Sequence, residues 1–231
     1  PCKAPQRTVS RLLPSFVRLS SHLYRCSDIF NTLIAGSKTS TKAVRQPAEN
    51  SPVAGVTNPG MTCNVNISPA AETVTVAAGD TIGFKLSNNM YHKGPAAIYL
   101  GKAPGAVENW DGSGQAWFKI AEWGPVFDGP QLSFTSLNMN EFTTTIPMNT
   151  PPGDYLVRAE QIALHLTGAP ENFMSCAQIR ITGNGNGNPP MVSIPGYISA
   201  TDPSVMVNIY EKVNSYTVRS LYHIFSIEFG L

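Results

Sequence analysis

Residues 153–181 read GDYLVRAEQIALHLTGAPENFMSCAQIRI. Two apolar runs, 154–166 and 174–181, are separated by a short polar connection that contains Gly168 and Pro170. Runs of this length, bounded by Gly and Pro, are typical of β-strands. We therefore predict two long strands joined by a short turn, and we expect the rest of the chain to pack around them.

These two runs contain polar and reactive side chains. Among them are Glu160, Gln161, His165 and Cys176, and the chain contains only four histidines and four cysteines. A strand that serves only to fill a core needs none of these residue types, because burial of an unpaired polar group costs free energy. The stretch is therefore a candidate for a chemical site as well as for the centre of the fold.

The remaining sequence predicts more strands and no long helix. Short apolar runs at 29–34, 97–100, 117–120 and 141–146 are separated by loops rich in Gly, Pro, Asn and Asp. Many short strands with turn signals between them are typical of an antiparallel β-sandwich. The predicted fold class is all-β, with an antiparallel β-sandwich and long loops.

One pair of runs has the pattern of a β-hairpin. Residues 72–76 alternate polar and apolar side chains, Ala78-Gly79-Asp80 has turn composition, and residues 81–86 resume the alternation. Alternation of this kind buries one face of each strand. We predict that the two runs pair with each other.

Composition sets the domain organisation. The chain has 231 residues and 42% hydrophobic content, which is enough for one sizeable core, and we expect a single domain over residues 27–217. The segment 1–26 is basic and free of acids, and 218–231 is an apolar ending without turn residues. We interpret both as atypical tails, which are either disordered or artefacts of the gene model or its translation.

Charge and hydropathy argue against two classes of partner. Five of the 16 Lys and Arg residues precede the first acid, Asp28, so 11 basic residues face 15 acidic ones in the rest of the chain. A mildly acidic body argues against a nucleic-acid partner. No apolar run approaches the roughly 20 residues of a membrane span, so we expect no membrane partner.

Cysteine spacing and one sequon favour an extracellular protein. No pair among Cys2, Cys26, Cys63 and Cys176 has the spacing of a zinc site. If 1–26 is foreign to the domain, Cys63 and Cys176 remain, either as a disulfide or as two buried thiols. Asn66 begins an Asn-Ile-Ser sequon and is a candidate glycosylation site.

The candidate chemistry centres on histidine. His92 lies in a turn-rich segment after an expected strand, and the chain contains no phosphate-binding Gly-rich loop, no G-x-S-x-G motif and no H-E-x-x-H pair. The residues alone therefore indicate a β-sandwich with a histidine site.

Seven motifs occur in order along the chain: YHKGP (91–95), WDGSG (110–114), WFKI (117–120), GDYLVRAEQIALH (153–165), SCAQ (175–178), PGY (195–197) and NIY (208–210). Together they resemble the fungal lytic polysaccharide monooxygenases of auxiliary activity family nine, and the resemblance runs from about residue 27 to residue 217.

The resemblance implies an immunoglobulin-like β-sandwich that is secreted, acts as a monomer and binds the surface of cellulose or a related β-1,4-glucan. One copper ion would be held by a histidine brace, which is the amine and imidazole of an N-terminal histidine plus a second imidazole. With O₂ or H₂O₂ and an external electron donor, members of the family oxidise C1 or C4 and cleave the chain. Nitrogen donors of this kind suit copper.

The resemblance also implies roles for single residues. His92 matches the second brace histidine, and His165 matches the histidine that hydrogen-bonds the oxygen species. Tyr210 matches an aromatic residue of the substrate face, and the family disulfide matches Cys63 with Cys176.

Three positions depart from the family pattern. The first brace histidine corresponds to Ser27, the axial tyrosine to Phe173, which cannot ligate a metal, and the glutamine beside the copper to Glu171.

Two hypotheses follow from these departures. In the first, the protein is a copper-dependent monooxygenase whose natural mature N-terminus is a histidine. In the second, it is a catalytically inactive relative that binds copper weakly or not at all and serves as a polysaccharide-binding or cell-wall protein.

Overall fold

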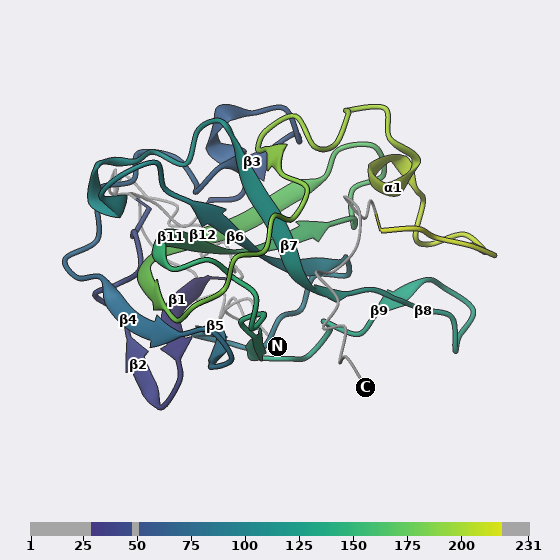
Figure 1. Ribbon diagram of the computed structural model, residues 1–231. Helices are drawn as coiled ribbons and strands as arrows, with labels where there is room; N and C mark the ends of the chain where they lie inside the picture. The colour runs from purple at the N-terminus through teal and green to yellow at the C-terminus, as the bar shows by residue number, and fades with distance from the viewer. Residues whose placement is uncertain (1–28, 48–50, 219–231) are drawn as a thin grey trace, which may run out of the picture.

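Figure 1 shows a computed structural model, which describes residues 29–47 and 51–218. The predicted tail 1–26 lies outside the described residues, and so does all of 218–231 except its first residue. The elements in chain order are β1 (Phe30–Ala35), β2 (Lys38–Ser40), β3 (Val53–Ala54), η1 (Pro59–Met61), β4 (Val74–Ala77), β5 (Thr81–Leu86), β6 (Ala96–Lys102), η2 (Val107–Asn109), β7 (Gln115–Trp123), β8 (Pro125–Val126), β9 (Ser133–Phe134), β10 (Glu141–Thr145), β11 (Gly153–Ala163), β12 (Glu171–Thr182), β13 (Val192–Ser193) and α1 (Pro203–Met206).

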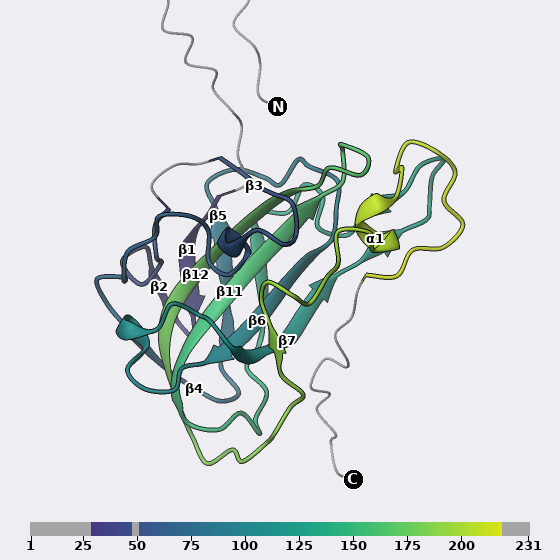
Figure 2. The ribbon, with the colours of Figure 1, turned by 90° about the horizontal axis from the view of Figure 1, so that it is seen from above.

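The strands form two main sheets. One sheet has the order β10-β5-β1-β2, and the other has the order β13-β7-β6-β11-β12-β3, with β4 paired to β12. All pairs in these sheets are antiparallel except β4 with β12, which is parallel. Figure 2 shows β11 and β12 running side by side through the larger sheet. The prediction of an all-β sandwich is confirmed.

The larger sheet is buried on both faces. Alternate residues of β11, such as Tyr155, Val157 and Ala159, join the core between the two sheets. The intervening residues, such as Leu156 and Ile162, join a second core on the outer face. This second core is completed by side chains from the loops and short helices, among them Met61, Val107, Trp110, Ile194, Ile198, Val205 and Ile209. Burial on both faces explains why β11 reads as a continuous run rather than as an alternation.

The predicted hairpin over 72–86 is wrong. β4 pairs with β12 in the larger sheet, whereas β5 pairs with β1 and β10 in the smaller sheet. The turn between them therefore crosses from one layer to the other, closed by the Asp80 carboxylate, which accepts a hydrogen bond from the amide of Ala77 (2.9 Å). Each strand still buries one face, because both sheets face the same core. Alternation reports burial of a face and does not identify the pairing partner.

The strand boundaries in the stretch 153–181 also differ from the prediction. β11 ends at Ala163, and β12 begins at Glu171. His165 therefore lies in the connecting turn rather than in a strand, where its side chain remains 27% exposed. A site at the end of a sheet can be held by rigid strands and still be reached from solvent.

The described residues contain little helix. The longest helical element is α1, whose four residues begin at Pro203 and are capped by the Asp202 carboxylate, which accepts from the amide of Ser204 (3.0 Å). Within residues 29–47 and 51–218, no helix has the length and apolar content that crossing a membrane requires.

Candidate metal centre

The register of β6 and β11 places His92 opposite His165. Gln161 pairs with Ala96 in this antiparallel ladder, and the backbone bonds continue past the strand end, from the Leu164 amide to the Lys93 carbonyl (2.9 Å). Extending the pairing by four residues in each direction brings the two histidines face to face. Their rings stack with centroids 4.7 Å apart and an interplanar angle of 18°. Side chains opposite each other in such a ladder are close neighbours.

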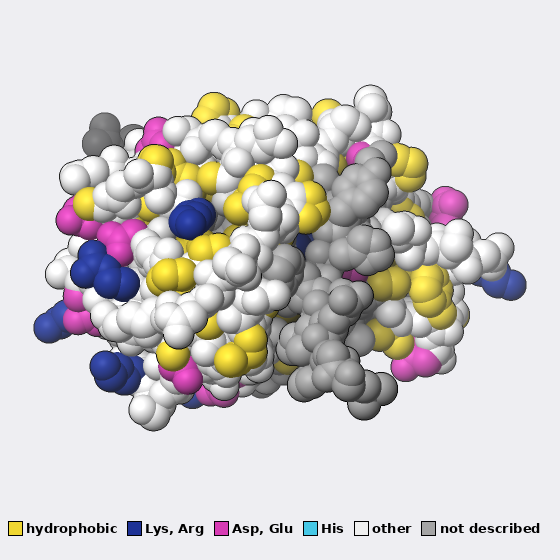
Figure 3. All heavy atoms as spheres, in the orientation of Figure 1, with side chains coloured by type: hydrophobic (Ala, Val, Ile, Leu, Met, Phe, Trp, Pro, Cys, Tyr) yellow, Lys and Arg dark blue, Asp and Glu magenta, His cyan; other side chains and the backbone are white. Residues whose placement is uncertain are grey.

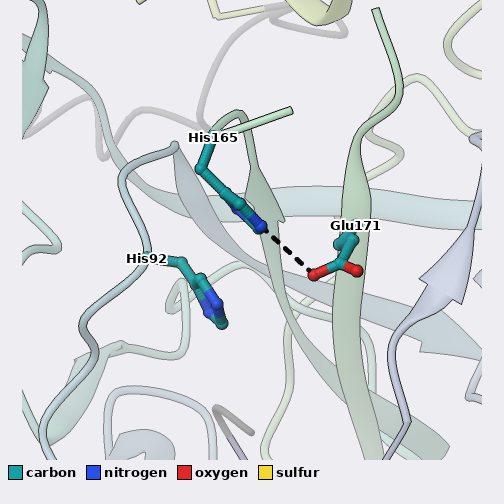
Figure 4. A group of neighbouring side chains, drawn as sticks. All are labelled: His92, His165 and Glu171. Atoms are coloured by element: carbon teal, nitrogen blue, oxygen red, sulfur yellow. Dashed lines mark ion pairs between the residues drawn. The ribbon is translucent and has the colours of Figure 1, made fainter. Parts of the chain in front are cut away.

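Glu171 completes a cluster of three side chains. It is the first residue of β12 and pairs with Ala163, which is two residues before His165 and therefore on the same face. Its Oε2 lies 3.4 Å from Nε2 of His165. One potential ligand atom from each of His92, His165 and Glu171 lies within 4.8 Å of the other two (Figure 4).

Aromatic rings surround His92. Phe173, on the same face of β12, stacks on the His92 ring with centroids 5.0 Å apart and an interplanar angle of 16°. The ring of Tyr91 lies 4.1 Å from that of His92 on a tilted plane. Phe173 is buried and carries no donor atom, so it supplies an apolar wall at the position where the resemblance implies the axial tyrosine.

Two residues fix the loop that carries His92. Gln161 is fully buried, and its side-chain amide donates to the His92 carbonyl (3.0 Å). The backbone of Gly94 lies so close to β11 that an added Cβ would be 1.8 Å from the carbonyl oxygen of Ile162. Sequence reasoning noted Gln161 but gave it no role, and it missed Gly94, because only the register shows which backbone passes beside it.

Replacement of Gly94 with alanine is therefore expected to lower the free energy of unfolding by about 1–3 kcal/mol and to displace the His92 loop. The new methyl group would collide with backbone, which cannot move aside as a side chain can. Urea unfolding of Gly94→Ala measures this change. Gly105→Ala is the matched control, because no atom lies within 4 Å of the Cβ that it would add. Equal stability of the two variants would contradict the close approach.

The predicted disulfide is present. Cys63 and Cys176 are bonded, with Cα atoms 5.2 Å apart, and both are buried in the second core. The alternative of two separate thiols is therefore wrong.

Asn66, three residues after Cys63, is exposed and has a left-handed backbone (φ 51°). Asn tolerates this conformation better than most residues, and the side chain is accessible for modification.

Tyr210 lies beside His165. The residue is 53% exposed, and its hydroxyl donates to the carbonyl oxygen of His165 (3.3 Å). This hydrogen bond ties the loop after α1 to the turn that carries His165. The structure thus brings four of the predicted site residues, His92, His165, Glu171 and Phe173, into contact range, with Tyr210 at their margin.

Glu160, by contrast, does not take part in this cluster. It points into the second core, where its carboxylate lies 2.6 Å from Nη2 of Arg158 and accepts hydrogen bonds from the hydroxyls of Tyr99 and Tyr197. Burial and the negative charge of Glu160 raise the pKa of both tyrosines well above the ordinary value, so both stay protonated. The unusual Glu160 of the sequence is therefore the partner of a buried arginine.

Charges on the surface are sparse. On the face shown in Figure 3, basic side chains are separated from one another and several lie close to acidic ones, while the rest of the surface is mostly uncharged or apolar. The low charged fraction of 13% agrees with this distribution.

The donor set of the cluster fits a transition-metal ion. Imidazole nitrogen suits copper, zinc and iron, and a carboxylate adds a negative charge that offsets that of a divalent ion. The two donors of known separation, His165 Nε2 and Glu171 Oε2 at 3.4 Å, lie close to the spacing of about 3.3 Å between ligands on a tetrahedral ion with bonds of about 2.0–2.1 Å. The first brace position, Ser27, lies outside the described residues.

Comparison with known proteins identifies the family. Residues 26–217 match the family model described as Auxiliary Activity family 9 (formerly GH61). The chain is 43% identical over 199 residues to AA9 family lytic polysaccharide monooxygenase H of Malbranchea cinnamomea, covering 83% of this chain and 86% of that protein. It is also 43% identical over 174 residues to AA9 family lytic polysaccharide monooxygenase E of Podospora anserina, a longer protein of which it spans 58%.

Solved structures give the same result. A cellulose-active polysaccharide monooxygenase from M. thermophila superposes with a TM-score of 0.73 at 30% identity, over 83% of this chain and 96% of that chain. The extended catalytic domain of H. jecorina LPMO9A superposes with a TM-score of 0.75 at 28% identity, over 85% of this chain and 90% of that chain. The chain therefore belongs to Auxiliary Activity family 9, a family of copper-dependent lytic polysaccharide monooxygenases.

Proposed function

We propose that this protein cleaves cellulose or a related β-1,4-glucan by copper-dependent oxidation at C1 or C4. The observation that carries the proposal is the convergence of His92, His165 and Glu171 at one end of the larger sheet, in a chain of this family. His92 would hold one copper ion. When bound, copper supplies the one-electron chemistry that activates O₂ or H₂O₂ after reduction by an external donor.

Each neighbouring side chain has a task in this proposal. His165 lies beside His92 and serves as the hydrogen-bonding group next to the metal, and Glu171 orients the His165 ring through the 3.4 Å contact with Nε2. Phe173 stacks on His92 and closes one side with an apolar ring. Tyr210 offers its exposed ring to a glucose unit, because the flat apolar face of a sugar packs on an aromatic face.

Further features of the proposal concern the cellular setting. The protein is secreted, which the disulfide between Cys63 and Cys176 supports, since such bonds persist in oxidising compartments. Asn66 carries a glycan, the protein acts as a monomer, and residues 27–217 are the functional domain. The sparse surface charge supports a neutral polysaccharide rather than a nucleic acid as partner.

Replacement of His92 with alanine tests the function. The full chain is incubated with swollen cellulose, copper, ascorbate and H₂O₂, and oxidised oligosaccharides are measured by mass spectrometry. We expect His92→Ala to release about a hundredfold less product, because the copper loses a nitrogen ligand. His22→Ala is the matched control, since it removes a histidine that lies outside the family match. Absence of oxidised products from the unsubstituted chain would overturn the proposed activity.

Replacement of Tyr210 with alanine tests the substrate face. Loss of one stacking ring is expected to cost about 1 kcal/mol, which weakens binding to cellulose about fivefold. Pull-down with insoluble cellulose measures the affinity without any need for turnover. Met148→Ala is the control, because Met148 is exposed but packs on Gly79 at the turn between β4 and β5. Equal binding by both variants would remove Tyr210 from the substrate face.

A further inference from the structure

We propose that Met206 is a site of oxidation by H₂O₂, and that its sulfoxide weakens binding to the polysaccharide by loosening the loop that carries Tyr210. This role of Met206 rests on the proposed function, which places Tyr210 on the substrate face and includes H₂O₂ among the reactants. Met206 lies outside the cluster of His92, His165 and Glu171, and its oxidation requires no metal.

The side chain of Met206 is accessible to solvent. Its exposed fraction is 46%, whereas Met61 and Met90 are fully buried. Met206 also lines an open groove of about 720 Å³ between α1 and residues 215–217. Among the methionines of the described residues, only Met148 is more exposed, at 66%. Peroxide in solution can therefore reach the sulfur of Met206.

Met206 packs on the turn that joins β11 to β12. A Cβ added to Gly168, in this turn, would lie 3.3 Å from Cε and 3.8 Å from Sδ of Met206. Gly168 has a left-handed backbone (φ 72°), and the same turn contains His165. Figure 2 shows α1, which ends at Met206, next to this turn. The thioether is thus an apolar contact between the end of α1 and the turn of His165.

Tyr210 makes the second contact between this loop and the turn. Its hydroxyl donates to the His165 carbonyl at 3.3 Å, which is longer than the usual range for a hydroxyl donor. A long and exposed hydrogen bond contributes little free energy, so the packing of Met206 is needed to hold the ring of Tyr210 in place. Val205 and Ile209 are buried in the second core and anchor the inner side of the loop. Loss of the Met206 contact would therefore change the outer side of the loop and leave the domain folded.

The reaction of a thioether with H₂O₂ is a transfer of one oxygen atom with two electrons. A lone pair of the Met206 sulfur attacks a peroxide oxygen, and the S–O bond forms as the O–O bond breaks. The departing hydroxide takes the proton of the transferred oxygen and leaves as water. Sulfur is oxidised and the peroxide is reduced, so no further reactant is needed. The product is a polar sulfoxide, which favours hydration over packing on Gly168.

Peptide mass spectrometry tests the modification. The full chain is treated with H₂O₂ in the presence of a chelator, and the sulfoxide at each methionine is measured over time. We expect Met206 and Met148 to react at least about tenfold faster than Met61 and Met90, because a buried sulfur is reached only when the fold opens. Oxidation of Met206 no faster than that of Met90 would overturn the proposal.

Pull-down with insoluble cellulose, after removal of the peroxide with catalase, tests the consequence. We expect the oxidised chain to bind about fivefold more weakly, which is the factor expected for loss of the Tyr210 ring. Methionine sulfoxide reductases of both stereospecificities are expected to restore the affinity. A loss of affinity that these reductases do not reverse would overturn the proposal.

Two matched variants assign the effect to one sulfur. Met206→Leu keeps an apolar side chain of similar volume but has no thioether, so we expect peroxide to leave its affinity for cellulose unchanged. Met148→Leu is the control and should respond to peroxide like the unsubstituted chain, because Met148 packs on Gly79 at the turn between β4 and β5. An equal loss of affinity in oxidised Met206→Leu and in the oxidised unsubstituted chain would overturn the role of Met206.

Hydrogen exchange separates this role from the proposed function. Within the turn, the amide of Ala169 donates to the Leu166 carbonyl (3.0 Å). We expect this amide to exchange faster after oxidation of the unsubstituted chain and at an unchanged rate in treated Met206→Leu. An unchanged rate in the oxidised unsubstituted chain would overturn the proposal. Peptide mapping and exchange need neither copper nor cellulose, so a chain that gives both expected results but does not bind cellulose would contradict the proposed function and not the modification of Met206.

Discussion

Replacement of Glu160 with alanine is expected to lower the free energy of unfolding by about 3–5 kcal/mol, because it leaves a buried positive charge without its counter-charge. Arg158 is fully buried, and its Nη2 lies 2.6 Å from the Glu160 carboxylate. Burial acts to lower the pKa of Arg158, but the Glu160 carboxylate together with Tyr197 and Tyr99 more than offsets this effect, so the pKa is raised and the guanidinium stays charged. The same substitution also removes the hydrogen-bond acceptor of the Tyr99 and Tyr197 hydroxyls.

Urea denaturation measures this decrease in the free energy of unfolding. Two further variants show which interaction causes it. Glu141→Ala removes one partner of the exposed ion pair with Lys85 (3.0 Å) and is expected to cost less than about 1 kcal/mol. The double variant Glu160→Leu/Arg158→Leu removes both buried charges and is expected to be more stable than Glu160→Ala. A loss below about 1 kcal/mol for Glu160→Ala would mean that Arg158 reaches solvent in solution.

The double variant Cys63→Ala/Cys176→Ala is expected to lose about 4–5 kcal/mol, since the disulfide closes a loop with a sequence separation of 113 residues. The bond removes conformations from the unfolded chain, and the effect grows with the length of the closed loop. It also connects the loop after η1 to the centre of β12, next to the carbonyls of Met61 and Thr62 that accept from Arg158. Removal of the disulfide is therefore expected to disturb the buried ion pair of Arg158 and Glu160 as well.

Urea unfolding measures this second effect. The comparison is made in a background with Cys2→Ser and Cys26→Ser, so that no other thiol of the chain can exchange with the pair. The background variant alone serves as the control. If the chain without the Cys63–Cys176 bond unfolds at the same urea concentration as the control, the disulfide contributes nothing to stability and the loop-closure account is wrong.

Local sequence patterns predicted the elements of this fold well. The strands expected at 29–34, 97–100, 117–120 and 141–146 correspond to β1, β6, β7 and β10, because apolar runs between Gly and Pro have few alternatives to a strand. Such patterns could not predict that β4 pairs with β12. An alternating strand satisfies either sheet of a sandwich, and only the complete packing decides which sheet it joins.

The site could be predicted only in part. His92 and His165 stood out in the sequence, a resemblance gave them roles and added Glu171 and Phe173, and the structure brings the four together through the β6–β11 and β11–β12 registers. The position of His165 after the end of β11, and the close approach of Gly94 to Ile162, depend on backbone contacts between distant segments. Neighbouring residues in the sequence carry no trace of such contacts.

The turn that joins β4 to β5 has a consequence for local opening of the molecule. It ties the two sheets together at the end of β12 where Thr182 pairs with Ala77, the end away from Glu171. At the histidine end, the two sheets are linked by the longer segment 87–95, between β5 and β6. The two sheets are thus joined by a short turn at one end and by a longer segment at the other, so the histidine end can open more easily. Amide protons near Ala77 should exchange with solvent only when the whole domain unfolds, whereas those around His92 can exchange through smaller openings.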